Sequence, residues 1–525
     1  HGNLGMQCYE TAPGLGMSRM RVRRRRLFLL CCASACVVSL LSCYGVFHLP
    51  RQGLRLKTTT ILGGFLWGDP LVATHPQSNL LSRIYNHNVA EKSLKQNSYR
   101  KDLAEEVLVL PDPTGPNGEL HKRAYVLHDD FNSYFARTET GDLCFREGME
   151  VASPKVKERG TMDNTGLRII LHHQEEENQV PMNLTIKVEQ CVCRPAWHGP
   201  ECGVPTVVQH SNIPTKSRLS PRKVPRRIIN AININHEFDL LHTRFHELAD
   251  AVDVFLVCES NFTAYGKSKP LTFLQLLLNG TFNYVKHKIL YIFLDHFPRG
   301  GRIDGWIADD YLRTFLTKNG LSRIWGLRPD DVFLLNDADE IPLREGIIFL
   351  KLYDGWTEPF GIHLRKSLYG FYWKQLGTLD VLSGCTVAML IMVYRRDGIL
   401  LRRRDYYTMP GFRQYENASG SILMPWSIGS PVHYAGWHCS WCFNPEGIHY
   451  KLISAQNGDF PRWGDFEEKR KLSYIRGLIR TGGWFDGSKP QYPPTHPKEH
   501  MFAPKYLLDN YERYHYLLEN PYAKP

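Results

Sequence analysis

From Arg227 onward, short apolar segments alternate with longer segments in which apolar residues recur every three or four positions. The short apolar segments span residues 227–235, 252–260, 287–295 and 331–337. Runs of this length are typical of buried strands, although a single run would also fit part of a buried helix. Segments 236–250 and 306–320 have helical spacing. Strands that alternate with helices predict an α/β fold with a parallel sheet.

Three carboxylates in four residues follow the last apolar segment, as Asp337-Ala338-Asp339-Glu340. Open α/β sheets bind ligands at the carboxyl ends of their strands, where Glu259, Asp295 and Asp337 are expected to lie. Asp337 and Asp339 are two residues apart, so both carboxylates can reach one divalent cation if the chain turns between them. A solvated acidic turn is the alternative interpretation of such a pair taken alone.

The N-terminal region has a different pattern. Residues 27–47, "LFLLCCASACVVSLLSCYGVF", are uncharged and long enough to cross a bilayer as a helix. Six arginines between positions 19 and 26 precede this segment, which favours a cytosolic N-terminus and a luminal remainder. We therefore expect a cytosolic tail (1–26), a signal anchor (27–47) and a turn-rich stem (48–140). A cleaved signal peptide is the alternative. Met17 and Met20 are candidate starts, so residues 1–16 are expected to be upstream sequence.

Charge adds little evidence for a nucleic-acid partner. The six arginines and Glu10 account for +5 of the formal net charge of +11, and the remainder is spread over the rest of the chain. The basic stretch 216–227 is interpreted as part of a solvated linker (205–226).

Cysteines and glycosylation motifs indicate an oxidising compartment. Eight of the thirteen cysteines follow the predicted anchor, and an even number favours disulfides. Four Asn-x-Ser/Thr motifs, at Asn183, Asn261, Asn279 and Asn417, agree with the secretory pathway.

The segment 141–204 ends in "CVCRPAWHGPECG", whose cysteine spacing resembles the last third of an EGF-like module. That resemblance implies a closing pair of Cys193 with Cys202, and Cys144 as the partner of Cys191. A zinc site is the alternative.

The C-terminal part is rich in aromatic residues. After Phe360, Trp and Tyr alternate with Asp, Asn and Gly in "SLYGFYWKQ", "YAGWHCSWCF" and "TGGWFDG". Core packing explains many of them, yet such loops also suit a carbohydrate, which stacks on rings and needs polar partners. A D-x-D pair at a strand end suits a nucleotide-sugar transferase, because a divalent cation neutralises the leaving diphosphate.

Five stretches resemble a known family: "DDVFLLNDADEIP", "RKSLYGFYWKQ", "MPGFRQYEN", "GWHCSWCF" and "SAQNGDFPRWGD". They are similar to the β-1,4-mannosyl-glycoprotein 4-β-N-acetylglucosaminyltransferases, and the likeness runs from Cys191 to the C-terminus. The resemblance implies a type II Golgi membrane protein with a GT-A-like, Rossmann-type catalytic domain (227–525). It also implies inverting transfer of GlcNAc from UDP-GlcNAc to O4 of the core β-mannose of N-glycans, with Mn²⁺, or Mg²⁺ in its place. Asn336 departs from the family, in which an acid is expected.

The resemblance also carries roles onto single residues. Asp337 and Asp339 match the metal and diphosphate motif, and Glu340 either assists them or orients the turn. Each of the remaining candidates has a structural alternative. Glu259 contacts the nucleoside or caps the next segment, and Arg313 approaches the diphosphate or forms a helix-face ion pair. Trp437 is a candidate for the rear wall of the site and His438 for a metal or phosphate contact, with a place in the core as the alternative for both. Cys439 and Cys442 are expected to be structural.

Inverting transfer also needs a general base, usually a carboxylate. The candidates are Asp304, Asp405, Glu416, Asp459 and Asp465. Two other functions stay open at this point. A tethered glycan-binding protein without catalysis would keep the aromatic loops, and a glycosidase would need two carboxylates across a sugar bond. A transferase of the same class with another acceptor is a further alternative.

Overall fold

The predicted parallel sheet is present, and further strands extend it. The computed structural model describes residues 124–150, 185–186, 190–298, 305–454, 462–489, 492 and 495–523. Within these residues the main sheet has nine strands. The four predicted strands are confirmed as β8 (Ile228–Asn233), β9 (Val254–Ser260), β10 (Ile289–Leu294) and β12 (Val332–Asp337). They pair in parallel in the order β10-β9-β8-β12.

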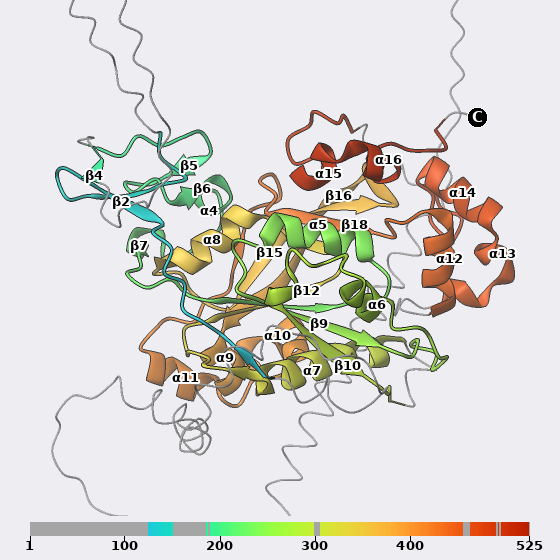
Figure 1. Ribbon diagram of the computed structural model, residues 1–525, viewed down its shortest axis with the longest axis horizontal. Helices are drawn as coiled ribbons and strands as arrows, with labels where there is room; N and C mark the ends of the chain where they lie inside the picture. Colours follow the sequence, from blue (N-terminus) through green and yellow to red (C-terminus); the bar gives the residue numbers. More distant parts are fainter. Residues whose placement is uncertain are drawn as a thin grey trace, which may run out of the picture. The chain divides into compact units, whose positions relative to one another are not determined.

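Helices cover both faces of this parallel part, as Figure 1 shows. The two predicted helices are confirmed as α5 (Phe238–Leu248) and α7 (Gly305–Ser322). Ile228 and Ile232 of β8 belong to one apolar cluster with α5 and α6 (Thr272–Leu278). Ile229 and Ala231 belong to the opposite cluster with α7, α9 (Val387–Met392) and α10 (Gly398–Arg403). Side chains alternate between the faces of a strand, so burial on both faces makes the whole strand apolar.

Antiparallel pairing continues the sheet beyond β12. Its strands are β16 (Gly370–Thr386), β15 (Phe360–Leu368), β18 (Gly436–Ser440) and β13 (Glu340–Pro342), with β17 (Trp426–Ile428) beside β15. β12 pairs antiparallel with β16, and β13 pairs antiparallel with β18. Trp426, Trp437 and Trp441 are buried here, which is the core-packing role considered for the aromatic residues.

The remaining helices lie before, between and after these strands. They are α4 (Thr206–Gln209), α8 (Arg344–Leu352), α11 (Phe412–Ser419), α12 (Pro445–Ser454), α13 (Glu467–Arg470), α14 (Leu472–Thr481), α15 (Lys505–Asp509) and α16 (Tyr511–Leu518). Helices α12 and α14 pack against each other, and α15 packs against α5.

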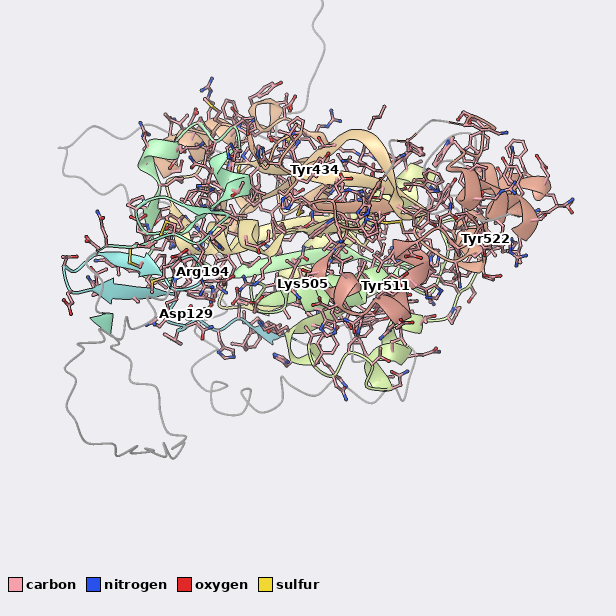
Figure 2. All side chains as sticks on the ribbon, turned by 90° about the horizontal axis from the view of Figure 1, so that it is seen from above. Asp129, Arg194, Tyr434, Lys505, Tyr511 and Tyr522 are labelled. Atoms are coloured by element: carbon pink, nitrogen blue, oxygen red, sulfur yellow. A yellow bond between two sulfur atoms is a disulfide. The ribbon has the colours of Figure 1, made fainter. Side chains whose placement is uncertain are left out.

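The cysteine segment forms both disulfides that the EGF-like resemblance implied, Cys144–Cys191 and Cys193–Cys202. Its strands are β3 (Leu143–Phe145), β4 (Thr185–Ile186), β5 (Trp197–His198) and β6 (Val204–Pro205), and β2 (Phe135–Thr138), just before the segment, pairs with β3 and β4. The disulfides of this segment lie beside Arg194 in Figure 2. Phe145 and Val204 share the apolar cluster of Ile228, so the segment packs directly on the α/β core.

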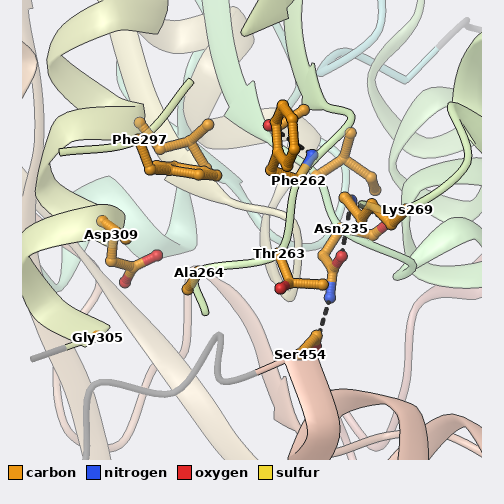
Figure 3. A pocket seen from close by; sticks show the side chains of 13 residues that line it. Asn235, Phe262, Thr263, Ala264, Lys269, Phe297, Gly305, Asp309 and Ser454 are labelled. Carbon is orange, nitrogen blue, oxygen red and sulfur yellow. Dashed lines mark hydrogen bonds between the residues drawn. The ribbon is translucent and has the colours of Figure 1, made fainter. Parts of the chain in front are cut away.

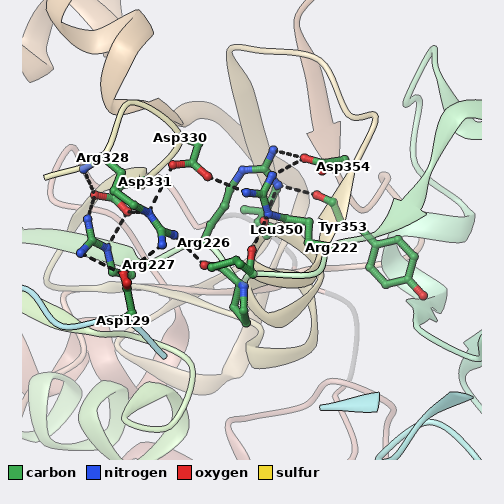
Figure 4. Close-up of polar contacts among 12 residues, drawn as sticks. Asp129, Arg222, Arg226, Arg227, Arg328, Asp330, Asp331, Leu350, Tyr353 and Asp354 are labelled. Atoms are coloured by element: carbon green, nitrogen blue, oxygen red, sulfur yellow. Dashed lines mark hydrogen bonds and ion pairs between the residues drawn. The ribbon is translucent and has the colours of Figure 1, made fainter. Parts of the chain in front are cut away.

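The basic stretch 216–227 is not solvated throughout, which corrects that interpretation. Arg226 and Arg227 are buried, and Arg227 forms a bidentate pair with Asp331 at 2.7 and 2.8 Å. Arg222 pairs with Asp330 and Asp354 (Figure 4). These ion pairs connect the stretch to the residues that flank β12 and α8. Buried arginines need such acidic partners.

The even number of cysteines after the predicted anchor does not mean that all eight form disulfides. Six pair, including Cys439 with Cys442, whereas Cys258 and Cys385 are free and buried. Both lie on strands of the main sheet within one apolar cluster, where a thiol packs as a small apolar group.

Several predictions fall on other parts of the chain. In the part that the structure describes, no helix is both long and apolar enough to cross a bilayer. The predicted anchor, residues 27–47, lies outside that part, as do Asn183, Asp304 and Asp459. Of the predicted stem, residues 124–140 are described, and β1 (Tyr125–Val126) pairs there with β11 (Ile324–Trp325).

Candidate active site

The D-x-D pair lies where the order of the parallel strands reverses. Asp337 ends β12, opposite Asn233 at the end of β8, and Ala338 and Asp339 form the turn into β13. Strand β9, which follows β8 in the chain, lies on one side of β8 in the sheet, and β12 lies on the other side of β8. Ligands of open α/β sheets bind in the crevice at such a reversal. The pair is therefore placed for ligand binding.

Asp337 is held by arginines. The Arg313 guanidinium donates to its two oxygens at 3.1 and 2.7 Å, and Arg402 lies 3.7 Å away. Burial alone would raise the pKa of Asp337, but Arg313 and then Arg402 lower it well below its usual range. Arg313 also donates to Asp309 at 3.0 Å, so the helix-face ion pair is present, and the same guanidinium contacts the D-x-D pair.

Glu340 orients the turn, which was one of its two predicted roles. Its carboxylate accepts a hydrogen bond from the backbone N–H of Asp337 at 3.0 Å. It also accepts two from Arg402, at 2.9 and 2.7 Å, and its side chain is 3% exposed. The buried Arg244 donates to the backbone carbonyls of Asp337 and Glu340. Hydrogen bonds to Asp337 and Glu340 thus hold both ends of the turn in place.

Asp339 has no such partners. Its Oδ2 lies 3.8 Å from His438 Nε2 and 3.8 Å from Lys451 Nζ, both beyond hydrogen-bond distance. Within the described residues nothing donates a hydrogen bond to this carboxylate. Burial raises the pKa of Asp339, against the opposing charges of His438 and Lys451. The carboxylate remains available to a ligand.

The residues around Asp339 fit a metal that completes its coordination with other ligands. His438 lies on β18 opposite Glu340, and its buried Nδ1 has no partner among the described residues. No group of three or more His, Cys, Asp or Glu side chains in the described part is arranged to hold a metal. Mg²⁺-type sites in nucleotide enzymes use one or two carboxylates and complete the shell with phosphate oxygens and water. Asp339 and His438 fit that kind of site.

A hollow lies at the carboxyl ends of β8 and β9, beside the start of α7 (Figure 3). Apolar side chains such as Phe262, Phe297 and Leu312 form part of its lining. Its polar lining residues are Asn235, Ser260, Thr263, Lys269, Asp309 and Ser454. A concave site that combines apolar lining with a few polar groups is typical of small-molecule binding.

Two contacts fix the polar lining of this hollow. Asn235 accepts a hydrogen bond from Lys269 Nζ at 2.7 Å and donates to Ser454 Oγ at 3.1 Å. Asp309 also accepts from Arg313, which connects the hollow to Asp337. Burial raises the pKa of Asp309 more than Arg313 lowers it.

The structure shows structural contacts for Glu259 and Trp437. Glu259 is fully buried and accepts from the backbone N–H groups of Phe273 and Leu274, at 2.7 and 3.1 Å, which caps α6. Trp437 is 4% exposed and donates to the Met501 carbonyl at 3.0 Å. Capping and core packing were the alternatives to donor contact for these two residues.

The general-base candidates within the described residues lie outside the lining of the hollow. Asp405 accepts from Tyr407, and Glu416 accepts from Arg413. Asp465 accepts from the Tyr265 hydroxyl at 2.7 Å. Each carboxylate already has a local partner.

The predicted glycosylation sites differ in exposure. Asn279, after α6, and Asn417, on α11, are exposed. Asn261 is half-buried, and its side-chain oxygen is buried without a partner among the described residues.

Sequence patterns did not point to Arg244, Arg402, Lys451, Asn235 or Lys269. Arg402 lies in a run of three arginines that resembles a solvated basic stretch. Its partner Glu340 is 62 positions away. Asn336, the departure from the family, is buried and bonds to Asn230 at 3.3 Å.

Known proteins are similar to this chain over nearly its whole length. The sequence pattern of Glycosyltransferase family 17 matches residues 182–378. The Homo sapiens protein named beta-1,4-mannosyl-glycoprotein 4-beta-N-acetylglucosaminyltransferase is 55% identical over 525 residues, which cover 96% of this chain and 95% of that protein. Proteins of the same name from Rattus norvegicus and Mus musculus are each 55% identical, with the same shares covered.

Proposed function

Because the chain belongs to glycosyltransferase family 17, we propose that it is an inverting transferase that moves GlcNAc from UDP-GlcNAc to O4 of the core β-mannose of N-glycans. The observation that carries this proposal is the 55% identity to a transferase of that name over 95% of its length. The open carboxylate of Asp339, at the same edge of the sheet as the hollow, agrees with it.

A GT-A-like arrangement of the catalytic domain accounts for the position of the site. The nucleoside would occupy the hollow at the ends of β8 and β9, between the apolar rings and the polar group formed by Asn235 and Lys269. Asp309 and Arg313 connect that hollow to Asp337, so the diphosphate would point towards the D-x-D turn.

Each side chain of the turn has a separate task in this proposal. Asp339 and His438 would hold Mn²⁺, or Mg²⁺ in its place, and the bound cation supplies charge neutralisation for the departing diphosphate. Asp337 keeps Arg313 in position, and Glu340 does the same for Arg402. Preorganised charges of this kind lower the barrier, because they need no rearrangement as charge develops.

The reaction itself is a single displacement. The acceptor O4 attacks the anomeric carbon of GlcNAc, the bond from that carbon to the diphosphate oxygen breaks, and UDP leaves with the electron pair. The proton of the acceptor hydroxyl goes to a carboxylate base.

The place of action follows from the N-terminal pattern. We propose a type II Golgi membrane protein, anchored by residues 27–47, whose catalytic domain meets N-glycans of glycoproteins in the lumen. The disulfides and the exposed sequons at Asn279 and Asn417 support a luminal domain.

The test is an assay of the full chain with UDP-GlcNAc, Mn²⁺ and a biantennary N-glycan, followed by linkage analysis. We expect one GlcNAc on O4 of the core β-mannose. GlcNAc found on an α-mannose would show that the acceptor assignment is wrong, while the chain would still be a transferase of this class. Glycan binding without metal-dependent UDP binding, measured by isothermal titration, would support a glycan-binding protein instead.

A further inference from the structure

Lys451 is a buried cation without a close partner. It lies on α12 and is 8% exposed, and its Nζ is 3.6 Å from Glu237 Oε1 and 3.8 Å from Asp339 Oδ2. Among the described residues none lies within hydrogen-bond distance of this ammonium. The rings of Trp441 and Phe443 face it at 5.3 and 5.6 Å. An ammonium has three donors, and burial without acceptors is costly.

The neighbouring buried cations, by contrast, all donate hydrogen bonds to side chains of the protein. Arg313 donates to Asp309 and Asp337, and Arg402 donates to Glu340. Lys269, equally buried, donates to Asn235 at 2.7 Å. The donors of Lys451 are therefore left for a group that the chain itself does not supply.

The position of Lys451 indicates which group that is. Ser454, one turn further along α12, lines the hollow and bonds to Asn235. Lys451 lies beside Asp339. Helix α12 thus runs from the hollow to the D-x-D turn, and residues three apart lie on one helix face. A donor whose nucleoside fills the hollow would place its diphosphate along this face.

We propose that Lys451 is a further catalytic residue, whose ammonium binds the diphosphate of the donor and neutralises it as UDP leaves. This inference rests on the proposed function. In the transfer, the bond from the anomeric carbon to the diphosphate oxygen breaks and its electron pair stays on UDP, while Lys451 keeps its proton and donates hydrogen bonds. Hydrogen bonds from an ammonium to phosphate are about twice as strong as neutral ones.

Glu237 completes this arrangement from the protein side. It is 5% exposed, and the backbone N–H groups of Asn235 and His236 donate to it at 3.0 and 3.1 Å. Its fixed carboxylate keeps Lys451 beside Asp339 before the donor binds.

The test compares UDP with uridine, which lacks the phosphates. Lys451→Met keeps most of the apolar stem against Trp441 and Phe443 and removes the charge. At saturating Mn²⁺ we expect UDP affinity of the full chain to fall by at least about tenfold, uridine affinity to change by less than about twofold, and turnover to fall by about 100-fold. Lys451→Arg should recover part of the UDP affinity. Lys505→Met, on the exposed face of α15, is the matched control and should behave as wild type.

Other results would contradict the proposal in distinct ways. Equal losses of UDP and uridine affinity would assign Lys451 a structural role, and unchanged UDP affinity would remove it from the diphosphate site. If Lys451→Met fails to fold, Lys451→Gln takes its place, and a ratio of UDP to uridine affinity in Lys451→Gln equal to wild type would overturn the inference. A wild-type chain that binds no UDP and transfers nothing would overturn the proposed function itself.

Discussion

Asp337 and Asp339 are two residues apart, yet their surroundings differ in a way that separates their roles. Arg313 pairs with both oxygens of Asp337, whereas the closest side-chain nitrogens to Asp339, those of His438 and Lys451, are 3.8 Å away. We expect Asp339→Asn to reduce turnover by more than about 100-fold, the scale of losing one preorganised charge at the transition state. The thermal midpoint should stay close to wild type, because no described residue donates a hydrogen bond to Asp339.

The measurement is turnover at saturating Mn²⁺ and UDP-GlcNAc beside a thermal scan. Asp142→Asn, exposed at the turn between β2 and β3, is the control that also removes one acid. Near-normal turnover in Asp339→Asn would return the D-x-D pair to the interpretation of a solvated turn.

Asp337→Asn should give a different result. The amide breaks the bidentate pair and leaves Arg313, whose side chain is 6% exposed, with Asp309 as its remaining close acid. Leaving a buried charged donor partly unpaired costs about 1–3 kcal/mol, so we expect both turnover and the thermal midpoint to fall. A thermal midpoint equal to that of Asp339→Asn would contradict the separation of roles.

Sequence reasoning found the acids of this site and Arg313, but it missed Arg402 and Lys451. Asp337 and Asp339 are adjacent to an apolar strand, so their position follows from local pattern alone. Arg402 and Lys451 reach the turn from 62 or more positions further along the chain, on helices whose contacts depend on the antiparallel half of the sheet. Local spacing carries no information about such a contact.

At the scale of elements, α6 depends on a single buried carboxylate from β9. Glu259 accepts from two backbone N–H groups of the first turn and from the Tyr291 hydroxyl at 3.0 Å. Glu259→Gln replaces one accepting oxygen with a donor, so we expect a loss of about 1–3 kcal/mol in unfolding free energy. Michaelis constants for UDP-GlcNAc should stay near wild type. An unchanged thermal midpoint with a large rise in KM would instead support a donor contact, and Glu512→Gln, exposed on α16, is the control.

The contact between α5 and α15 should make stability depend on pH. His242 bonds to the Tyr506 hydroxyl at 3.1 Å, and burial, with His246 nearby, lowers the pKa of His242 to about 4. Its pKa in the unfolded chain is near 6.5. The unfolded state therefore binds the proton first, so this stabilisation is complete above about pH 6.5 and decreases as the pH falls towards 4.

We expect His242→Phe to reduce the fall in thermal midpoint between pH 7 and pH 5, since the ring is kept and the titrating group is lost. His515→Phe, exposed on α16, should retain the wild-type dependence. Identical pH profiles for wild type and His242→Phe would show that His242 does not contribute.

The parallel elements were predictable and the antiparallel ones were not, for a physical reason. Strands β8, β9 and β10 are buried on both faces and stand out as continuous apolar runs. Strand β16 has exposed and half-buried residues along much of its length, and its pairing with β15 is broken by register shifts. Neither an apolar run nor a regular alternation marks it.

At the scale of the whole molecule, two disulfides fasten the cysteine segment, and they should differ in their contribution. Cys144 and Cys191 are 47 positions apart, whereas Cys193 and Cys202 are 9 apart. A cross-link restricts the unfolded chain more when it closes a longer loop, which gives about 4 kcal/mol for the first and about 2.5 kcal/mol for the second. The segment also packs on the α/β core, since Phe145 and Val204 belong to the same apolar cluster as Ile228. We therefore expect the double variant Cys144→Ser and Cys191→Ser to have a lower thermal midpoint than the double variant Cys193→Ser and Cys202→Ser, measured without reductant.

Turnover at a temperature where both double variants stay folded should remain near wild type, because no described residue of this segment lines the hollow. Equal midpoints for the two variants would show that loop length does not decide the contribution, and loss of turnover in a folded variant would connect this segment to the active site.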